Sequence, residues 1–177
     1  MVALLKTGVA PHGSVLGPMA EVVFRSTQYL SDADARAMAV YLQALPQHAA
    51  TPAKQAVAPV SVMERGAKVY EAQCAQCHGA QGQGAKDEAG QPAFPPLAGN
   101  RAVVLADPTN LVRVVLQGGY LPATAGNPRP HGMPPFQHLL GDEDVAAVTT
   151  FVRNSWGNQA AGVGTIEVYR ARERRSP

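Results

Sequence analysis

The chain has 177 residues, of which 46% are hydrophobic and 16% charged, and its formal net charge is +2. This length suffices for one domain of ordinary size, or for one domain and part of another. The low charge, without a basic stripe upstream of residue 165, argues against a nucleic-acid partner. Nothing approaches the roughly 18 consecutive apolar residues of a membrane span, and the apolar run in residues 1–6 is too short for a signal peptide.

Helical spacing of apolar residues is the main local signal. It marks the stretches 31–45, 60–75, 108–117, 142–155 and, more weakly, 165–173. Ser31 and Ser61 are the predicted N-caps of the first two helices, since each precedes an acidic residue by three positions. Gly66 costs a helix about 1 kcal/mol relative to alanine, so we expect another element to pack closely against it. No stretch is typical of a strand, and the predicted fold class is all-α.

Two further stretches lack helical periodicity. Residues 46–58 are rich in proline, alanine, glutamine and threonine, which predicts a linker at a domain boundary. The 17 glycines and 15 prolines are concentrated between residues 79 and 141. Such a segment cannot be mostly helix or central strand, so we expect a large buried cofactor to hold it in shape.

The motif with the clearest chemistry is C-x-x-C-H at residues 74–78. Cys74 and Cys77 are spaced to add to the two vinyl groups of one haem, and His78 can then bind the iron. A thioredoxin-like site would require a βαβ context. A structural zinc site needs about four nitrogen or sulfur ligands, and no second cysteine pair exists. The motif therefore predicts one covalently attached haem c.

A sixth iron ligand is expected on a loop downstream of the motif. Met133 follows Gly132 and precedes two prolines, which favours an extended loop able to cover a haem face. Its thioether is a soft ligand that favours Fe(II) and raises the reduction potential. His131 and His138 are the rival ligands, and a core methionine is the alternative role for Met133.

The Phe94–Leu97 run is predicted to support the ligating histidine. Such a histidine needs an acceptor for its other ring N–H, and the carbonyl of Pro95 is the expected one, with that of Pro96 as the alternative. Leu97 is expected to pack on the haem, unless this run is a plain surface turn. Trp156 is expected either to pack at the end of the last helix or to form a wall of the cofactor site.

Three other features have a simple interpretation. His12 and His48 lie in a loop and in the linker and are expected to be solvated. The last residues include a cluster of arginines, namely Arg170, Arg172, Arg174 and Arg175. We expect a solvated tail here, although a contact with a partner subunit or with anionic lipid is the alternative.

Four runs of residues carry a resemblance to a known family: Val69–Gly79, Phe94–Asn100, Gly132–Pro134 and Arg153–Asn158. They resemble the third haem domain of the triheme cytochrome c subunit of membrane-bound bacterial alcohol, aldehyde and gluconate dehydrogenases. The resemblance covers essentially the whole chain. It implies a class I cytochrome c-like domain with helices around one haem.

The resemblance also implies a domain organisation. It comprises the end of a preceding cytochrome c domain at 1–45, the linker at 46–58, the haem domain at 59–158 and a basic tail at 159–177. Met19 matches the axial methionine of the preceding domain, whose own C-x-x-C-H is not in this sequence. We therefore expect the chain to be a fragment, Met19 to bind no haem, and apolar surface of 1–45 to be exposed or docked on the haem domain.

The function implied by the resemblance is electron transfer rather than catalysis. The implied partners are the catalytic subunit of a dehydrogenase, ubiquinone or a terminal oxidase as acceptor, and the surface of the inner membrane. The implied location is periplasmic, peripheral on the outer face of that membrane, with an export signal that this sequence lacks. The alternatives are a peroxidase-like haem enzyme with an open iron site, in which Met133 is not bound, and a stand-alone single-haem carrier.

Overall fold

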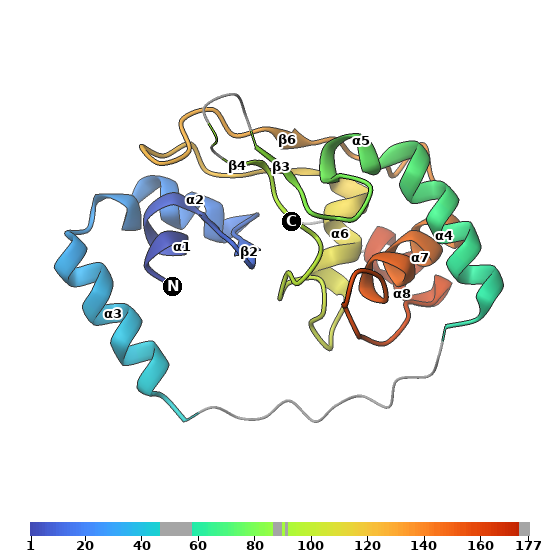
Figure 1. Ribbon diagram of the computed structural model, residues 1–177, viewed down its shortest axis with the longest axis horizontal. Helices are drawn as coiled ribbons and strands as arrows, with labels where there is room; N and C mark the ends of the chain where they lie inside the picture. Colours follow the sequence, from blue (N-terminus) through green and yellow to red (C-terminus); the bar gives the residue numbers. More distant parts are fainter. Residues whose placement is uncertain (47–57, 87–89, 91, 174–177) are drawn as a thin grey trace.

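The computed structural model describes residues 1–46, 58–86, 90 and 92–173. Its first group of elements comprises α1 (Val2–Thr7), β1 (Val9–Ala10), β2 (Gly13–Ser14), α2 (Pro18–Arg25), the 3-10 helix η1 (Thr27–Tyr29) and α3 (Asp32–Ala44). The second comprises α4 (Val60–Gln73), α5 (Ala75–His78), β3 (Ala85–Lys86), β4 (Pro92–Phe94), α6 (Thr109–Gln117), β5 (Gly119–Tyr120), β6 (Gly132–Met133), α7 (Asp142–Arg153) and α8 (Thr165–Glu173). The helices α1, α2 and α3 of the first group lie on one side of the view in Figure 1, and the helices α4 to α8 of the second group lie on the other.

The predicted all-α class is confirmed in that the fold is mainly helical. Three antiparallel pairs of very short strands, β1–β2, β3–β4 and β5–β6, were not expected from the sequence. Each strand has only two or three residues, too few for an alternating pattern to be recognised. Most of the predicted linker, residues 47–57, lies outside the described residues.

The predicted helix starts are partly correct. Ser31 caps α3, because its Oγ accepts the N–H of Asp34 at 3.1 Å. The prediction for Ser61 is wrong, since α4 begins after Pro59 without a side-chain cap. The extended backbone of Pro59 (φ −54°, ψ 140°) precedes the helix directly and leaves Ser61 inside the first turn.

The core of the second group is the packing of α4 against α7, and Gly66 makes it possible. A Cβ atom at Gly66 would lie 2.3 Å from the carbonyl oxygen of Ala147 and 2.6 Å from the Cβ of Phe151. The expected close neighbour of this glycine is therefore confirmed. Helix α7 is buried along most of its length, and its Thr149 hydroxyl donates to the Val145 carbonyl at 2.6 Å, so the buried polar group has a partner.

Helix α8 packs on α6 and α7 through Val168 and Ala171, which are both buried. Arg172 donates from Nε to the Asp142 carboxylate at 2.9 Å and from Nη2 to the Leu140 carbonyl at 3.1 Å. The expectation of a solvated tail is therefore wrong for Arg172, which contacts a segment 30 residues away in the sequence, whereas Arg170 is exposed as expected. Two of the four arginines, at positions 174 and 175, lie outside the described residues.

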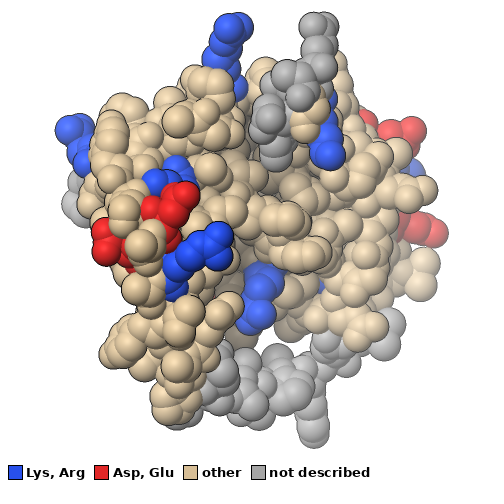
Figure 2. Space-filling model, turned by 60° about the vertical axis from the view of Figure 1, so that its left-hand side comes forward, with Lys and Arg blue, Asp and Glu red and all other residues tan. Residues whose placement is uncertain are grey.

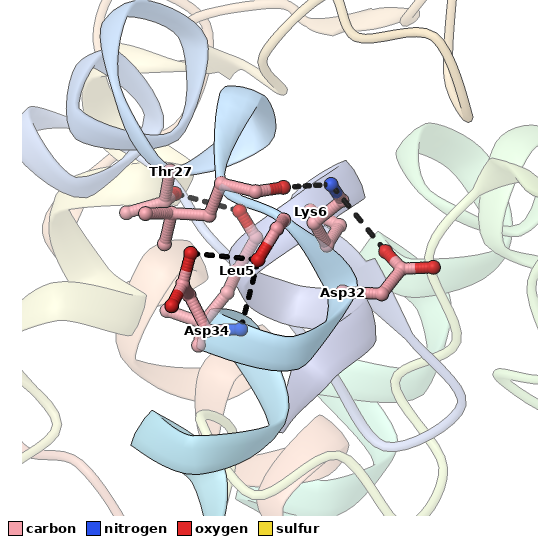
Figure 3. A network of polar contacts seen from close by, with 7 residues as sticks. Leu5, Lys6, Thr27, Asp32 and Asp34 are labelled. Carbon is pink, nitrogen blue, oxygen red and sulfur yellow. Dashed lines mark hydrogen bonds and ion pairs between the residues drawn. The ribbon is translucent and has the colours of Figure 1, made fainter.

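The first group is held together by polar contacts between α1 and the start of α3 (Figure 3). The Thr27 hydroxyl donates to the Leu5 carbonyl at 2.6 Å, and the Lys6 ammonium donates to the Leu30 carbonyl. Lys6 also lies 3.5 Å from the Asp32 carboxylate. These contacts fold α1 back onto η1 and α3.

Among the described residues, two hydrogen bonds join the first group to loops of the second. The N–H of Arg101 donates to the carbonyl of His12 at 3.1 Å, and the hydroxyl of Thr124 donates to the carbonyl of Thr7 at 3.2 Å. The His12 side chain is exposed, as expected, and His48 lies outside the described residues.

Much of the surface of the first group is apolar. On the face drawn in Figure 2 the charged side chains are few, both signs are mixed, and most of the surface is uncharged. The exposed large apolar side chains of this group are Met1, Met19, Val22, Phe24, Tyr29, Met38, Val40, Tyr41, Leu42 and Leu45. Within the part of the chain that the structure describes, no helix has the length and hydropathy to cross a bilayer.

Candidate haem-binding site

The C-x-x-C-H motif forms a single turn at the end of α4. The N–H of Cys74 donates to the Tyr70 carbonyl at 2.9 Å, and the N–H of His78 donates to the Cys74 carbonyl at 2.9 Å. Both cysteines are free thiols and both are half-buried. The turn therefore presents two unreacted thiols and an imidazole from five consecutive residues.

The imidazole of His78 is fixed by the loop that follows. Its Nδ1 lies 3.0 Å from the carbonyl oxygen of Pro95, which is the predicted contact. A carbonyl can only accept, so Nδ1 carries the proton and the lone pair is on Nε2. The alternative acceptor, the Pro96 carbonyl, is instead bonded to the Asn100 side chain at 2.9 Å.

Burial favours the neutral forms of the His78 imidazole and of the Cys74 thiol. It lowers the pKa of His78, while the hydrogen bond to Pro95 acts in the opposite direction. Burial, helped by the charge of Cys77, raises the pKa of Cys74 to about 11. A neutral imidazole is the form that binds a metal, whereas zinc requires cysteine thiolates. No group of three or more His, Cys, Asp or Glu side chains that could hold a metal ion is found among the described residues.

An apolar cluster surrounds the motif. Its buried members are Tyr70, Val103, Val148 and Val152, and the half-buried residues packed against it include Val69, Cys74, Ala75, Leu97, Val104, Leu111, Phe151 and Trp156. Leu97 thus shares a cluster with the first cysteine. An apolar environment of this kind suits the faces of a porphyrin.

Trp156 packs at the end of α7, the first of its two expected roles. Its ring centroid lies 4.8 Å from that of Tyr70 and 5.4 Å from that of Phe151. Trp156 has a positive φ of 55°, which turns the chain sharply after α7. A Cβ atom at Gly82 would lie 2.5 Å from the Trp156 ring, so a glycine is needed beneath it.

Met133 lies in β6, paired with Gly119 of β5, and is half-buried. It packs against a second apolar cluster that includes Val112, Leu116 and Phe136. Val69 packs against both clusters, so the methionine side and the cysteine side of the core adjoin.

The rival ligands have more exposed side chains than Met133. His131 and His138 are both exposed, and the His131 ring stacks on Phe94 with centroids 4.6 Å apart. Of the three candidate sixth ligands, Met133 is therefore the one whose side chain packs in an apolar environment.

Sequence reasoning missed the polar side chains that hold the loop after β4. Asn100, Arg153 and Asn158 are all buried, and all three donate to backbone carbonyls. Arg153 donates from Nη1 to the Val103 carbonyl at 2.7 Å and from Nε to the Ala161 carbonyl at 2.8 Å. All three residues lie within the runs that carry the family resemblance, Phe94–Asn100 and Arg153–Asn158, but no role was assigned to them.

The residues present fit a covalently attached haem. Two free thiols stand at the required spacing, and the His78 lone pair is on Nε2 because Nδ1 is engaged. The half-buried Met133 thioether offers a second axial ligand, and the apolar side chains of the two clusters offer contacts for the porphyrin.

Comparison with known proteins agrees with this donor set. The cytochrome c family model matches residues 63–156. The chain is 39% identical to the cytochrome c subunit of the quinone alcohol dehydrogenase of Gluconobacter oxydans, over 100% of this chain and 38% of the relative. It is 35% identical to the gluconate 2-dehydrogenase cytochrome c subunit of Pantoea cypripedii, over 92% of this chain and 38% of that protein.

A smaller relative matches about half of the chain. Cytochrome c-552 of Thermus thermophilus is 38% identical over 52% of this chain and 69% of its own length. By contrast, the chain spans only 38% of the length of the dehydrogenase subunits.

Proposed function

Because the chain belongs to the cytochrome c family, we propose that it carries electrons through one covalently attached haem c and catalyses no reaction of its own. The observation that carries the proposal is the C-x-x-C-H turn, with two free thiols and with His78 Nδ1 bonded to Pro95. When bound, the haem supplies a one-electron Fe(III)/Fe(II) couple.

The chain's own residues would hold the group in three ways. Cys74 and Cys77 would attach it, each sulfur forming a thioether by addition of S–H across a vinyl double bond. His78 Nε2 and the Met133 sulfur are the proposed iron ligands. Leu97, which packs in the same cluster as Cys74, would contact the porphyrin and exclude water.

Retention of two axial ligands distinguishes an electron carrier from a haem enzyme. With both positions filled, oxygen and peroxide have no open site. The half-buried position of Met133 in an apolar cluster supports a bound sixth ligand. A peroxidase-like protein would instead leave Met133 unbound, give a high-spin ferric spectrum and bind cyanide readily.

The wider setting is also a proposal. Cytochrome c subunits of alcohol, gluconate and fructose dehydrogenases are 32–39% identical to this chain. We infer a dehydrogenase catalytic subunit as electron donor, and ubiquinone or a terminal oxidase as acceptor. The inferred location is the periplasmic face of the inner membrane.

The domain organisation inferred from the resemblance fits this setting. Residues 59–158 would be the haem domain and 159–177 its C-terminal extension. Residues 1–45 would be the end of a preceding cytochrome c domain. The exposed apolar side chains of α2 and α3 and the greater length of the dehydrogenase subunits support this division. A stand-alone carrier would have no reason to expose these side chains.

The test is optical spectroscopy of protein exported and matured with a haem-attachment system. We expect a c-type reduced-minus-oxidised spectrum and the weak ferric band at the red end of the visible range that reports methionine–iron bonding. Met133→Ala should abolish that band, whereas Met19→Ala, which removes an exposed methionine of α2, should leave it intact. Survival of the band in Met133→Ala would refute the ligand assignment, and a colourless product with free thiols would refute the proposed function.

A further inference from the structure

Asn158 joins the end of α7 to the loop that follows β4. It is only 5% exposed. Its Nδ2 donates to the Leu97 carbonyl at 3.0 Å and to the Val152 carbonyl at 2.8 Å, and its Oδ1 accepts the N–H of Gly99 at 2.9 Å. Both donor hydrogens of the amide are therefore used, one toward the helix and one toward the loop.

The loop is held from its other side by Gly82. The N–H groups of Leu97 and Ala98 both donate to the Gly82 carbonyl, at 2.7 and 2.9 Å. Asn158 and Gly82 thus bind opposite edges of the same peptide segment, which fixes Leu97 in position.

The two residues just before Leu97 cannot be held by backbone N–H donation as Leu97 and Ala98 are. Pro95 and Pro96 have no backbone N–H, so neither can donate a backbone hydrogen bond. The nearest backbone donors after the Pro95 carbonyl are those of Leu97 and Ala98. The position of that carbonyl, 3.0 Å from His78 Nδ1, consequently depends on two anchors: the Asn100 side chain, which donates to the Pro96 carbonyl at 2.9 Å, and the bonds that hold Leu97.

We propose that Asn158 is a positioning residue that holds the Pro95 carbonyl against His78 Nδ1 and thereby sets the reduction potential of the haem. This inference rests on the proposed function. An acceptor at Nδ1–H makes the imidazole a stronger electron donor to the metal, which favours Fe(III). Loosening the acceptor favours Fe(II), so the reduction potential rises when Asn158 is removed.

The test compares Asn158→Leu and Asn158→Ser with a matched control, Asn154→Leu. Asn154 lies at the same helix end, but its amide donates only within the helix, to the Thr150 carbonyl at 2.9 Å. Each full-length holoprotein is equilibrated with a redox dye of known potential. The exchange of the His78 ring N–H with solvent is followed by NMR in the reduced, diamagnetic state.

We expect the ratio of reduced to oxidised protein at a fixed dye potential to rise about threefold or more in Asn158→Leu, with faster exchange of the ring N–H. Asn158→Ser, which keeps a hydroxyl near Leu97, should change both readouts in the same direction. The Asn158→Ser variant decides the test if Asn158→Leu yields no folded holoprotein. Asn154→Leu should match the parent.

Two outcomes would overturn the inference. One is an unchanged potential and unchanged exchange in an Asn158 variant that carries haem. The other is an equal shift in Asn154→Leu, which would indicate general loosening of the helix end. Failure of the proposed function differs from both, since the parent itself would then show no haem or no reversible reduction.

Discussion

Replacing Gly66 with alanine should destabilise the protein although alanine is the better helix former. The alanine gains about 1 kcal/mol of helix propensity in α4. Its Cβ, however, would lie 2.3 Å from the Ala147 carbonyl oxygen, 2.9 Å from the Ala147 carbonyl carbon and 2.6 Å from the Phe151 Cβ. None of these atoms is the flexible end of a side chain, so relief requires α4 and α7 to separate.

The magnitude follows from the balance of the two effects. Overpacking of a filled core costs roughly 1–3 kcal/mol, and the clash with backbone atoms places Gly66 at the upper end of this range. After the gain in propensity, the free energy of unfolding should fall by about 2 kcal/mol. Because α4 also ends at the C-x-x-C-H turn, we expect the methionine–iron band to weaken in the same variant.

The assay is urea unfolding of the holoprotein followed by circular dichroism. The control is Gly13→Ala, since a Cβ at Gly13 would meet no atom within 4 Å. The control should change the free energy of unfolding by no more than about 1 kcal/mol. A Gly66→Ala protein as stable as the parent would refute the packing argument, because the gain in helix propensity would then offset the whole cost of the clash.

Two further predictions concern buried polar contacts. Burial, together with the charge of Cys74, raises the pKa of Tyr70 to about 12, so the folded state keeps the phenolic proton longer than the unfolded state does. In the holoprotein, where Cys74 is a thioether and does not titrate, the contribution of Tyr70 to stability should therefore be constant below about pH 10, the ordinary pKa of a tyrosine, and fall as the pH rises from there to about 12. Tyr70→Phe should remove this alkaline loss, but it should cost about 1 kcal/mol at about pH 7 because the bond to the Gly79 carbonyl is lost. Urea titrations at neutral and alkaline pH measure both effects. Equal alkaline losses in the parent and in Tyr70→Phe would contradict the assignment of the loss to Tyr70. Arg172→Met should lower the free energy of unfolding by about 1–2 kcal/mol, because it removes the bonds to Asp142 and Leu140. The exposed Arg170 on the same helix is the control, with an expected change within about 0.5 kcal/mol, and similar losses for both arginines would argue against specific contacts by Arg172.

Local patterns predicted the longer helices well. The prediction for 31–45 agrees with α3 (Asp32–Ala44), and that for 165–173 has the bounds of α8. By contrast, α1 and α2 were missed. They have six and eight residues, which leaves too few turns for an apolar stripe to repeat.

The contacts that depend on distant segments could not be predicted in the same way. The bonds of Arg172 to Asp142 and of Asn158 to Leu97 span 30 and 61 residues, and no local pattern encodes them. The His78–Pro95 contact was predictable because a general requirement of ligating histidines narrowed the choice to one proline-fixed turn. The role of Met133 as iron ligand stays a prediction.

The pairing of α4 with α7 has a consequence for how the protein is made. Gly66 and Ala147 are separated by roughly 80 residues, so their contact closes a long loop. All of the residues proposed to bind haem lie within it. If the chain is exported from its N-terminus, as the proposed location implies, Cys74 and Cys77 emerge from the membrane well before the helix that packs against α4. The order of the elements thus gives an interval in which both sulfurs are accessible for cofactor attachment before the core closes around them.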